Sequence, residues 1–365
     1  MKLLYINPNI NEAGGLPKVL SVKTNYLIEN FDYQISILTQ NNGHLSPFFE
    51  FNKKIDFFDM KLNSYKFSKF FLYKQALNQH IKIINPDLII VCDFGLKGFL
   101  IPFIVKTRIP ILFEAHGSIY NESVSYKHNI FSKYSHKLKY AYRDFCAKKF
   151  DYFVALSQES LKEWNNKNGI VIPNPINNLD NRIALLKSKK VIVISRHSYE
   201  KGLDRLLKIW KIVNQKHPDW QLDIYGNLDE SNSIIQLAKI LEVEKSINFY
   251  EPVRNIKEKY FEASIYVMTS RTEGFGMVLL EAMSFGLPVI AYDCPIGPRS
   301  IIENNKNGFL IEDGNDNEFV NAIYKLIKNQ NLRIDMGKNA KISSEKYNLD
   351  TIMKSWHKLF KKIVS

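Results

Sequence analysis

Short apolar segments recur along the whole chain, and each is separated from the next by a stretch long enough for a helix. In the first half of the chain these segments lie at 2–7, 34–38, 88–91, 111–114 and 152–156. In the second half they lie at 191–195, 221–225, 247–250, 265–268, 288–292 and 308–311. Strands that alternate with helices form parallel sheets covered by helices on both faces. The sequence therefore predicts an α/β fold built from doubly wound, Rossmann-like sheets.

The length and one proline-rich stretch predict two domains. A chain of 365 residues exceeds what one ordinary core organises. Residues 172–185 contain two prolines and four asparagines, which is typical of a linker. We therefore predict an N-terminal domain over 1–175 and a second domain over 176–345. The last segment, 346–365, has apolar residues at helical spacing, and we expect this helix to pack back onto the first domain.

The composition excludes several classes of protein. No apolar run reaches the roughly 18–20 residues that a membrane-spanning helix needs. The N-terminal apolar run is too short for a secretory signal. Cys92, Cys146 and Cys294 are odd in number and lack metal-ligand spacing, which argues against both a disulfide scaffold and a structural metal. We expect a cytoplasmic protein.

The formal net charge is +13, and one segment is strongly basic. Between Lys127 and Lys149 there are seven lysines and arginines, with Asp144 as the single acidic residue, and aromatic residues are interleaved with them. A basic helix that carries aromatic residues suits an anionic membrane surface. It equally suits a solvated helix face whose aromatic rings enter the core. Nucleic acid is not expected, because no nucleic-acid-binding motif accompanies the charge.

Polar or glycine-rich turns follow several of the predicted strands. Gly14 and Gly15 follow the first strand, but the G-x-G-x-x-G pattern is absent, which disfavours NAD. Asp93 follows the third segment, and His116 follows the fourth in the run E-A-H-G. Because ligands of open α/β sheets bind beyond the carboxyl ends of strands, His116 is a candidate site residue, although a lone histidine is often structural.

Residues 271–288, R-T-E-G-F-G-M-V-L-L-E-A-M-S-F-G-L-P, predict a glycine turn that passes into a helix. We expect Gly274 and Gly276 to adopt positive φ, and the helix to direct its N-terminal amides at the turn. Such a corner favours a phosphate-bearing ligand. Glu273 on the turn and Glu281 on the helix are acceptors that suit a hydroxyl-rich ligand, but glutamates beside glycines also occur at ordinary capped helices.

Two cations stand in the turn after the first strand of the second domain. Arg196 and Lys201 could clamp a diphosphate, or they could belong to a solvated basic loop.

Together these motifs resemble those of the family 4 glycosyltransferases, retaining enzymes of the two-Rossmann GT-B architecture, whose domains face each other across a cleft. The resemblance covers nearly the whole chain. It is carried by G-G at 14–15, E-A-H-G at 114–117, P-N-P at 173–175, S-R-H-S-Y-E-K-G at 195–202, the pair Glu273 and Glu281, and D-C-P-I-G-P-R at 293–299.

The resemblance implies roles for individual residues. Arg196 and Lys201 would hold the donor diphosphate, and Glu273 would engage hydroxyls of the donor sugar. His116 would contact the transferred sugar near its reacting face, which completes the predicted catalytic set. The donor-binding residues that the resemblance implies are Gly14, Gly15, Gly226, Val253, Gly274, Phe275, Gly276, Met277, Val278 and Glu281. Among them, Glu281 would accept from the ribose, and Gly14 with Gly15 would approach the diphosphate across the cleft.

The activity that follows from the resemblance is transfer of a hexose or N-acetylhexosamine from a nucleotide sugar. The turn at 293–299 replaces a commoner glycine-rich turn and resembles enzymes that use UDP-hexoses, so UDP-GalNAc, UDP-Gal or UDP-GlcNAc is the expected donor. Glu251 stands where the family commonly has glycine. The acceptor would be a lipid-linked or growing surface glycan of lipopolysaccharide or capsule biosynthesis, at the inner face of the membrane if segment 127–149 binds lipid.

No cofactor and no metal are expected, since the chain contains no Asp-x-Asp motif and cationic side chains could stabilise the leaving diphosphate. Two alternatives stay open. One is a UDP-sugar 2-epimerase of the same architecture, against which the Glu273–Glu281 spacing and the loop at 196–201 argue. The other is a catalytically silent nucleotide-sugar-binding partner of another transferase.

Overall fold

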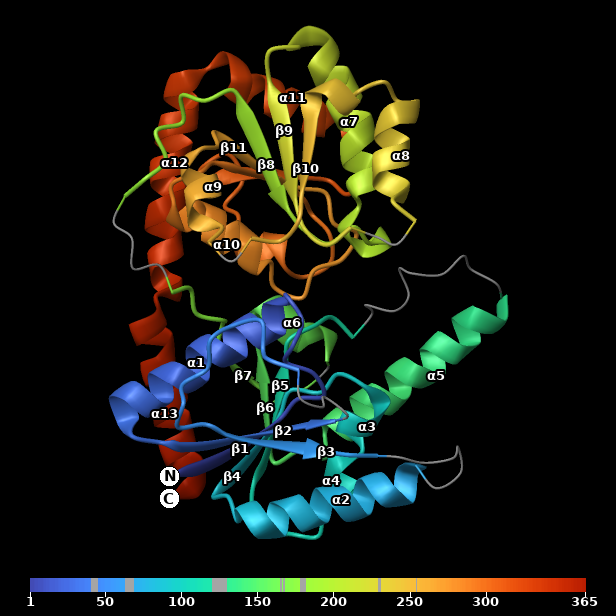
Figure 1. The fold of residues 1–365 in the computed structure, drawn as a ribbon, viewed down its shortest axis with the longest axis vertical. Coiled ribbons are helices and arrows are strands. Elements are labelled where there is room, and N and C mark those ends of the chain that lie inside the picture. Colours follow the sequence, from blue (N-terminus) through green and yellow to red (C-terminus); the bar gives the residue numbers. More distant parts are fainter. Residues whose placement is uncertain are drawn as a thin grey trace. The chain divides into compact units, whose positions relative to one another are not determined.

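The computed structural model describes residues 1–40, 45–62, 69–119, 130–164, 166, 168–177, 182–228, 231–253 and 255–365 (Figure 1). The chain divides into two compact units. The first unit comprises Met1–Ile119, His128–Asn177 and Leu349–Ser365, and the second contains Asn178–Asn348. The last helix therefore belongs to the same unit as the N-terminus.

The first unit is built on a seven-stranded sheet in which every pairing is parallel. Its strands are β1 (Lys2–Ile6), β2 (Gln34–Gln40), β3 (Asp56–Met60), β4 (Leu88–Val91), β5 (Ile111–Ala115), β6 (Tyr152–Ala155) and β7 (Ile170–Val171). The spatial order is β3-β2-β1-β4-β5-β6-β7. The sequence analysis misses the two edge strands, because β3 reads D-F-F-D-M with little apolar continuity and β7 has only two residues.

Helices cover both faces of this sheet, and alternate residues of β1 point to opposite faces. Leu3 and Tyr5 join a core that includes residues of α1 and α13, whereas Leu4 and Ile6 join a second core that includes residues of α2, α4 and α5. The helices of this unit are α1 (Gly15–Phe31), α2 (Lys69–Ile84), α3 (Leu96–Phe99), α4 (Ile101–Ile104), α5 (Ile130–Ala147), α6 (Gln158–Glu163) and α13 (Leu349–Val364). The sheet is therefore a middle layer with an apolar core on each side.

Helix α13 packs against α1 through a strongly one-sided apolar face. Trp356 and Phe360 of α13 are almost fully buried in the same core as Leu20 and Leu27 of α1. This packing buries the indole of Trp356 beside α1, where it meets Lys23.

The second unit repeats the architecture with six parallel strands in the order β10-β9-β8-β11-β12-β13. They are β8 (Lys190–Ile194), β9 (Gln221–Tyr225), β10 (Ile247–Tyr250), β11 (Ile265–Met268), β12 (Val289–Tyr292) and β13 (Gly308–Ile311). Its helices are α7 (Leu203–Lys216), α8 (Ser233–Ile240), α9 (Lys257–Phe261), α10 (Met277–Ser284), α11 (Asp316–Lys328) and α12 (Gln330–Ser344). The α/β fold with two parallel sheets is confirmed.

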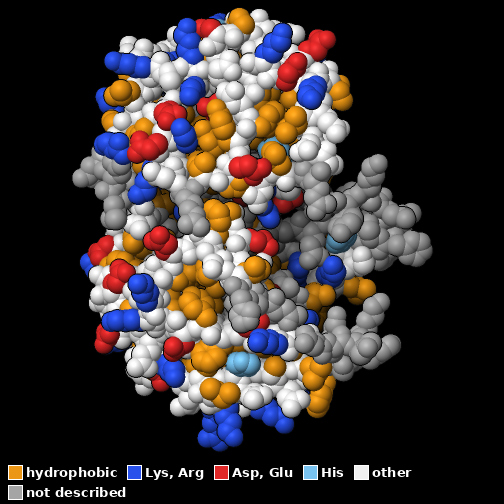
Figure 2. Space-filling view, in the orientation of Figure 1, with side chains coloured by type: hydrophobic (Ala, Val, Ile, Leu, Met, Phe, Trp, Pro, Cys, Tyr) orange, Lys and Arg blue, Asp and Glu red, His pale blue; other side chains and the backbone are white. Residues whose placement is uncertain are grey.

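Among the described residues, no helix combines the length and the apolar character that crossing a membrane requires. On the face drawn in Figure 2, basic and acidic side chains are interspersed between hydrophobic ones. The net positive charge is thus not gathered into one patch over the described part of that face.

Candidate functional site

Each sheet reverses its strand order beside its first strand, and ligands of open α/β sheets bind beyond the carboxyl ends of the strands at such a point. In the second unit the reversal lies between β8 and β11, which are neighbours in the sheet. Residues 195–202 follow β8, and residues 269–276 follow β11. The two segments that carry most of the predicted catalytic residues therefore leave the sheet at the position where a ligand is expected.

Lys201 and Glu273 are in direct contact. The Nζ atom of Lys201 donates to Oε1 of Glu273 at 2.7 Å, and the hydroxyl of Ser270 donates to the same oxygen at 2.7 Å. The two charged side chains are 21% and 10% exposed. No residue of the described part bonds to Oε2 of Glu273, so one carboxylate oxygen is fixed while the other can accept from a ligand hydroxyl.

A glycine brings these two segments together. Gly202 has φ 64°, and a Cβ atom at this position would lie 2.1 Å from the carbonyl oxygen of Thr269. The hydroxyl of Thr269 in turn donates to the carbonyl oxygen of Gly202 at 2.9 Å. Only glycine combines this conformation with this approach. The contact places Lys201, the preceding residue, next to the loop that carries Glu273.

Arg196 lies at the start of the same segment but does not contact Glu273. Its guanidinium bonds to Glu200 four residues later, at 3.3 Å, and the side chain is 56% exposed. An exposed pair of this kind contributes little to stability. Arg196 can therefore exchange Glu200 for an anionic ligand at small cost.

Gly226, a predicted donor-binding residue, has a structural requirement that the sequence does not reveal. A Cβ atom there would lie 1.8 Å from the carbonyl oxygen of Ser195 and 3.2 Å from the amide nitrogen of Arg196. The end of β9 therefore packs backbone to backbone against the start of the Arg196 segment. This contact alone explains why glycine stands at 226.

The glycine turn differs in part from its prediction. Gly276 adopts φ 90° and caps the start of α10, as expected. Gly274 is not among the described glycines with positive φ, so that expectation is wrong for Gly274, and the turn needs only one left-handed residue. The ring of Phe275 is buried and packs edge-on against Tyr347 at 5.8 Å between centroids, while Met277 begins α10.

Helix α10 begins directly after this turn, and the amides of Met277 and Val278 have no partners within the helix, whereas that of Leu279 donates to the carbonyl oxygen of Gly276 at 2.9 Å. Met277 and Val278 are only partly buried in that first turn. The positive end of the helix is therefore presented beside Glu273 and can bind an anion.

The turn at 293–299 packs against the glycine turn at 273–276. The amide of Gly297 donates to the carbonyl oxygen of Glu273 at 3.2 Å, and a Cβ atom at Gly297 would lie 2.8 Å from both the Cβ of Glu273 and the carbonyl oxygen of Phe275. Arg299 closes the turn with two bonds to Asp293, at 2.8 and 3.1 Å. The D-C-P-I-G-P-R segment thus holds the glycine turn in place through the contacts of Gly297.

Two further predicted residues lie in the same unit. Glu281 is on α10, and its Oε2 atom accepts from the hydroxyl of Tyr260 at 3.3 Å. Val253 follows β10 and is 40% exposed. Their roles toward ribose and base stay predictions.

Arg271 is a residue whose importance the sequence analysis misses. Its guanidinium makes a two-pronged contact with Asp204 at 2.8 and 2.7 Å, donates to the carbonyl oxygen of Tyr199 at 2.6 Å, and lies 3.9 Å from the centre of the Tyr199 ring. Its amide also donates to the carbonyl oxygen of Glu200 at 2.7 Å. Burial by itself would raise the pKa of Asp204, but the hydrogen bond and charge of Arg271 lower it. Arg271 therefore ties the Lys201 segment to the Glu273 loop.

The predicted residues of the first unit follow β1 and β5. Gly14 precedes α1 in an extended conformation, and a Cβ atom at Gly15 would meet nothing within 4 Å, so this backbone is open to a ligand. His116 follows β5, and its Nε2 atom lies 2.8 Å from Oε2 of Glu114. Asp93, in contrast, accepts from the amide of Gly95 at 2.7 Å and thus shapes its own turn.

Glu114 is the centre of a buried charged group. Lys23 of α1 donates to both of its carboxylate oxygens, at 2.8 and 2.7 Å, and both side chains are about 1% exposed. Burial would raise the pKa of Glu114, but the charge of Lys23 and the hydrogen bond from His116 lower it to about 2. The carboxylate therefore stays charged and acts only as an acceptor.

Cys92, Glu114 and His116 place potential metal ligands within 4.8 Å of one another. The chemistry of this group does not suit a cation. Lys23 already occupies both oxygens of Glu114, and its ammonium would repel a metal ion. Burial, with the Glu114 charge, raises the pKa of the Cys92 thiol well above its ordinary value, whereas metals bind the thiolate.

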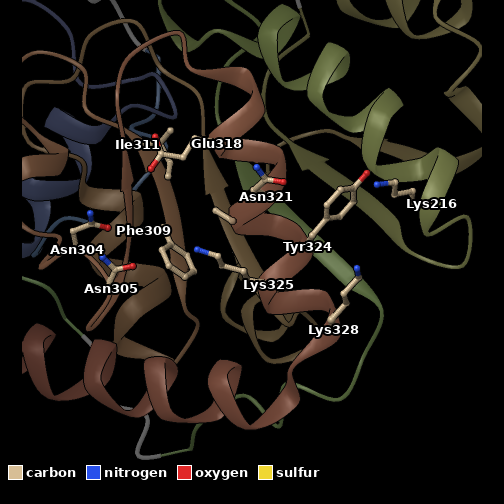
Figure 3. A pocket seen from close by; sticks show the side chains of 11 residues that line it. Lys216, Asn304, Asn305, Phe309, Ile311, Glu318, Asn321, Tyr324, Lys325 and Lys328 are labelled. Carbon is tan, nitrogen blue, oxygen red and sulfur yellow. The ribbon is translucent and has the colours of Figure 1, made fainter.

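A cavity of about 490 Å³ lies elsewhere in the second unit, between α11 and the edge strand β13 (Figure 3). Phe309, Tyr324 and Lys325 are among the residues that line it. Of the described residues around this cavity, none is a predicted site residue. It therefore does not mark the ligand position that the strand topology indicates.

Comparison with known proteins identifies the family of the chain. The family model for "Glycosyltransferase Family 4" matches residues 14–178, and the model for "Glycosyl transferases group 1" matches residues 165–343. An uncharacterized glycosyltransferase of Haemophilus influenzae is 30% identical over 366 residues, which cover 97% of this chain and 98% of that protein. The chain belongs to the family 4 glycosyltransferases.

Solved structures place this glycosyltransferase in the GT-B fold. The Anabaena protein HepE in complex with UDP and glucose matches with a TM-score of 0.80 and 19% identity, covering 99% of each chain. The lipopolysaccharide outer core galactosyltransferase WaaB matches with a TM-score of 0.75 and 21% identity, covering 99% of this chain and 100% of that one. The predicted family and fold class are thus confirmed.

Proposed function

We propose that this glycosyltransferase moves a hexose or N-acetylhexosamine from a UDP-sugar to a lipid-linked or growing surface glycan, with retention of the anomeric configuration. The observation that carries the proposal is the contact of Lys201 and Ser270 with one oxygen of Glu273, at the switch point of the sheet and beside the start of α10. The similarity to a protein solved with UDP and glucose, and to a galactosyltransferase of lipopolysaccharide, supports the donor and acceptor classes.

The proposed chemistry depends on charge that develops as the sugar–phosphate bond breaks. The departing diphosphate gains negative charge, and groups already oriented toward it lower the barrier most. Lys201, Arg196 and the first amides of α10 supply positive charge and N–H donors on one side of the glycine turn. We propose that they perform this task without a metal ion.

Glu273 and His116 are proposed to act on the sugar. The free oxygen of Glu273 accepts from a sugar hydroxyl, while its other oxygen keeps Lys201 in place for the diphosphate. His116 presents its Nδ1 atom to the sugar, because Nε2 is engaged by Glu114. Neither residue is proposed as a covalent nucleophile, and the acceptor attacks from the face that the diphosphate leaves.

The test is release of UDP or GDP from a panel of nucleotide sugars, with and without lipid-diphosphate acceptors. Acceptor-dependent release from one or more UDP-sugars is expected. An epimerase would instead convert the donor into its isomer, and a silent partner would bind nucleotide without releasing it. Nucleotide binding without release or transfer across the panel would contradict the proposal.

Glu273→Gln sharpens this test because it keeps the shape of the side chain. The amide still accepts from Ser270 but loses the ionic contact with Lys201. We expect turnover to fall about 100-fold, as is common when a group that stabilises the transition state is removed, with little change in stability. A rate near that of the wild type would remove Glu273 from the mechanism.

We also propose that the first unit touches an anionic membrane through a surface formed by α5 and α4. Leu138 and Phe145 of α5 are 72% and 56% exposed, and Phe145 stacks on the exposed ring of Phe103 with 6.0 Å between centroids. Lys137 is exposed on the same helix, and Lys149 follows it with its Nζ 5.4 Å from the centre of the Phe145 ring. Apolar side chains flanked by lysines suit the boundary between lipid headgroups and acyl chains.

The predicted basic segment contributes to this surface only in part. Arg143 is buried and donates to the carbonyl oxygen of Ile119 at 3.1 Å, so it cannot face lipid. Lys148 is paired with Asp144 at 2.7 Å. Lys127 lies outside the described residues, and the side chain of Lys133 is not described either.

Sedimentation with vesicles of phosphatidylglycerol and phosphatidylcholine tests the membrane surface. Lys137→Glu with Lys149→Glu should weaken binding to anionic vesicles several-fold, since each basic residue near such a surface contributes about 1 kcal/mol. Lys208→Glu, at an exposed position of α7 in the other unit, is the matched control. Equal binding of the wild type, the double variant and the Lys208→Glu control would indicate that the segment is an ordinary solvated helix.

A further inference from the structure

The most unusual side chain outside the donor-binding loops is Lys23. It lies on the inner face of α1 between buried Leu20 and Leu27, and it is 1% exposed. A lysine is almost never fully buried unless it is paired, because desolvating its charge is costly. A helix that needed only packing here would carry an apolar residue. The position therefore requires a reason beyond stability.

The partners of Lys23 lead to the predicted sugar-binding histidine. Its ammonium bonds to both oxygens of Glu114, and Oε2 of Glu114 is also bonded to Nε2 of His116 at 2.8 Å. A third contact is the Trp356 ring of α13, whose centre lies 3.6 Å from Nζ. Lys23 of α1, Glu114 of β5 and His116 thus form one continuous series of hydrogen bonds. Trp356 of the last helix covers the ammonium of Lys23.

The hydrogen bonds from Lys23 through Glu114 to His116 fix which nitrogen of the imidazole carries a proton. A charged carboxylate accepts hydrogen bonds and cannot donate them, so the Nε2 atom of His116 must carry a proton. Among the residues that the structure describes, none bonds to Nδ1, which leaves that nitrogen for a ligand. Lys23 balances the charge of Glu114, so the imidazole need not supply the balancing charge itself.

Trp356 completes the enclosure of Lys23. Its ring covers the ammonium at a distance typical of a cation–π contact, which replaces part of the lost hydration. Its indole nitrogen has no hydrogen-bond partner among the described residues, so the ring face, not the N–H, is the functional part. The C-terminal helix is thereby linked to the orientation of His116.

We propose that Lys23 and Trp356 are positioning residues for His116 and act through Glu114 to hold the imidazole as the Nε2–H tautomer. The inference rests on the proposed function only in assigning His116 to the donor sugar. The positioning itself concerns this unit alone and can be measured without any substrate.

Long-range ¹H–¹⁵N spectra of the full chain labelled with ¹⁵N-histidine provide the direct test, with His116→Gln used to assign the signal. In the wild type we expect the shifts of a neutral ring protonated at Nε2. Lys23→Met leaves Glu114 with the imidazole as its remaining charge partner, and we expect the ¹⁵N shifts of His116 to differ from those of the wild type.

Because Lys23→Met leaves a buried charge and can unfold the protein, two further variants keep the test decisive. Lys23→Met with Glu114→Gln removes both charges, and an amide that can offer either oxygen or nitrogen should allow both tautomers. Trp356→Phe retains a ring over Lys23 and loses no hydrogen bond, so its His116 signal should match the wild type, whereas Trp356→Leu should shift it. Phe360→Leu truncates the core of the same helix and is the packing control.

Unchanged His116 shifts in the folded double variant and in Trp356→Leu would overturn the proposal. Kinetics separate this failure from failure of the proposed function. With a donor that supports UDP release, the double variant should lose about 10- to 100-fold in kcat, the scale expected when a catalytic group is misplaced, with KM for the donor within a few-fold of the wild type. If His116→Gln itself retains full turnover, the role of His116 in transfer is wrong whatever the spectra show.

Discussion

Substitution of Arg271 should have a large effect although Arg271 is not among the proposed catalytic residues, because its side chain joins the two loops of the proposed donor site. Arg271→Ala removes the two-pronged contact with Asp204, the bond to the carbonyl oxygen of Tyr199 and the stacking on the Tyr199 ring. What remains between the loops is the backbone bond from residue 271 to Glu200 and the close contact at Gly202.

The size of the effect follows from the exposure of the partners. Hydrogen bonds to charged groups contribute about 1.5–3 kcal/mol when buried. The Arg271 side chain is 12% exposed but Asp204 is 34% exposed, so water compensates part of the loss. We expect the free energy of unfolding to fall by about 1–3 kcal/mol, well above the value for an exposed pair.

The effect on activity should exceed the effect on stability. The segment that loses its anchor carries Lys201, and a displacement of about 1 Å at a catalytic group can cost about 100-fold in rate. Arg271→Lys should recover little, since an ammonium cannot reproduce the planar fork. Urea denaturation and UDP release are the assays, and Arg182→Ala, which breaks an exposed pair with Glu258, is the control. A free energy of unfolding of Arg271→Ala within about 0.5 kcal/mol of that control, together with turnover within twofold of it, would refute the bracing role.

Two other predictions concern the supports of the site. Gly297→Ala should lower turnover while the protein stays folded, because its Cβ would lie 2.8 Å from the Cβ of Glu273 and force the turn to move. A normal rate in a UDP-release assay would show that packing against Gly297 does not position the turn. The pair of Lys23 and Glu114 should stabilise the fold fully above about pH 4.5 and lose this contribution as pH falls toward 2, since the native pKa of Glu114 is lowered from 4.5 to about 2. Urea titrations across that interval should therefore be steeper in pH for the wild type than for Lys23→Met with Glu114→Gln, and parallel curves would contradict the assignment.

The sequence predicts a strand well where a short segment rich in apolar residues lies between polar turns, whether the strand is central or at an edge of the sheet. The predicted bounds of β9, β10, β11 and β13 equal those observed, because each is a short apolar run between polar turns. The strands β3 and β7 lack this signal, since β3 carries two aspartates among its five residues and β7 has only two residues. The doubly wound order of the strands could also be predicted, because the connections between parallel strands are right-handed.

The proposed site could be predicted from the sequence only where a motif contains the residue that is proposed to act in glycosyl transfer. Glu273 and Lys201 lie in motifs, and the structure brings them into contact. Their supports are set by tertiary contacts, as when Arg271 reaches Asp204 across 67 residues of sequence. One signal was present nonetheless, since Lys23 is the charged residue on the buried face of α1, between Leu20 and Leu27, and a charge at a core position requires a buried partner.

Lys201, with Arg196, is proposed to stabilise the leaving diphosphate in place of a metal ion. The most direct test is the rate of UDP release by the wild type and Lys201→Ala, each measured in excess EDTA, with Lys208→Ala as a control at an exposed position of α7. We expect EDTA to leave the wild-type rate unchanged, and we expect Lys201→Ala to lower kcat by about 100-fold or more while Lys208→Ala does not. Loss of wild-type activity in EDTA that returns with added Mg²⁺, or near-normal turnover of Lys201→Ala, would contradict it.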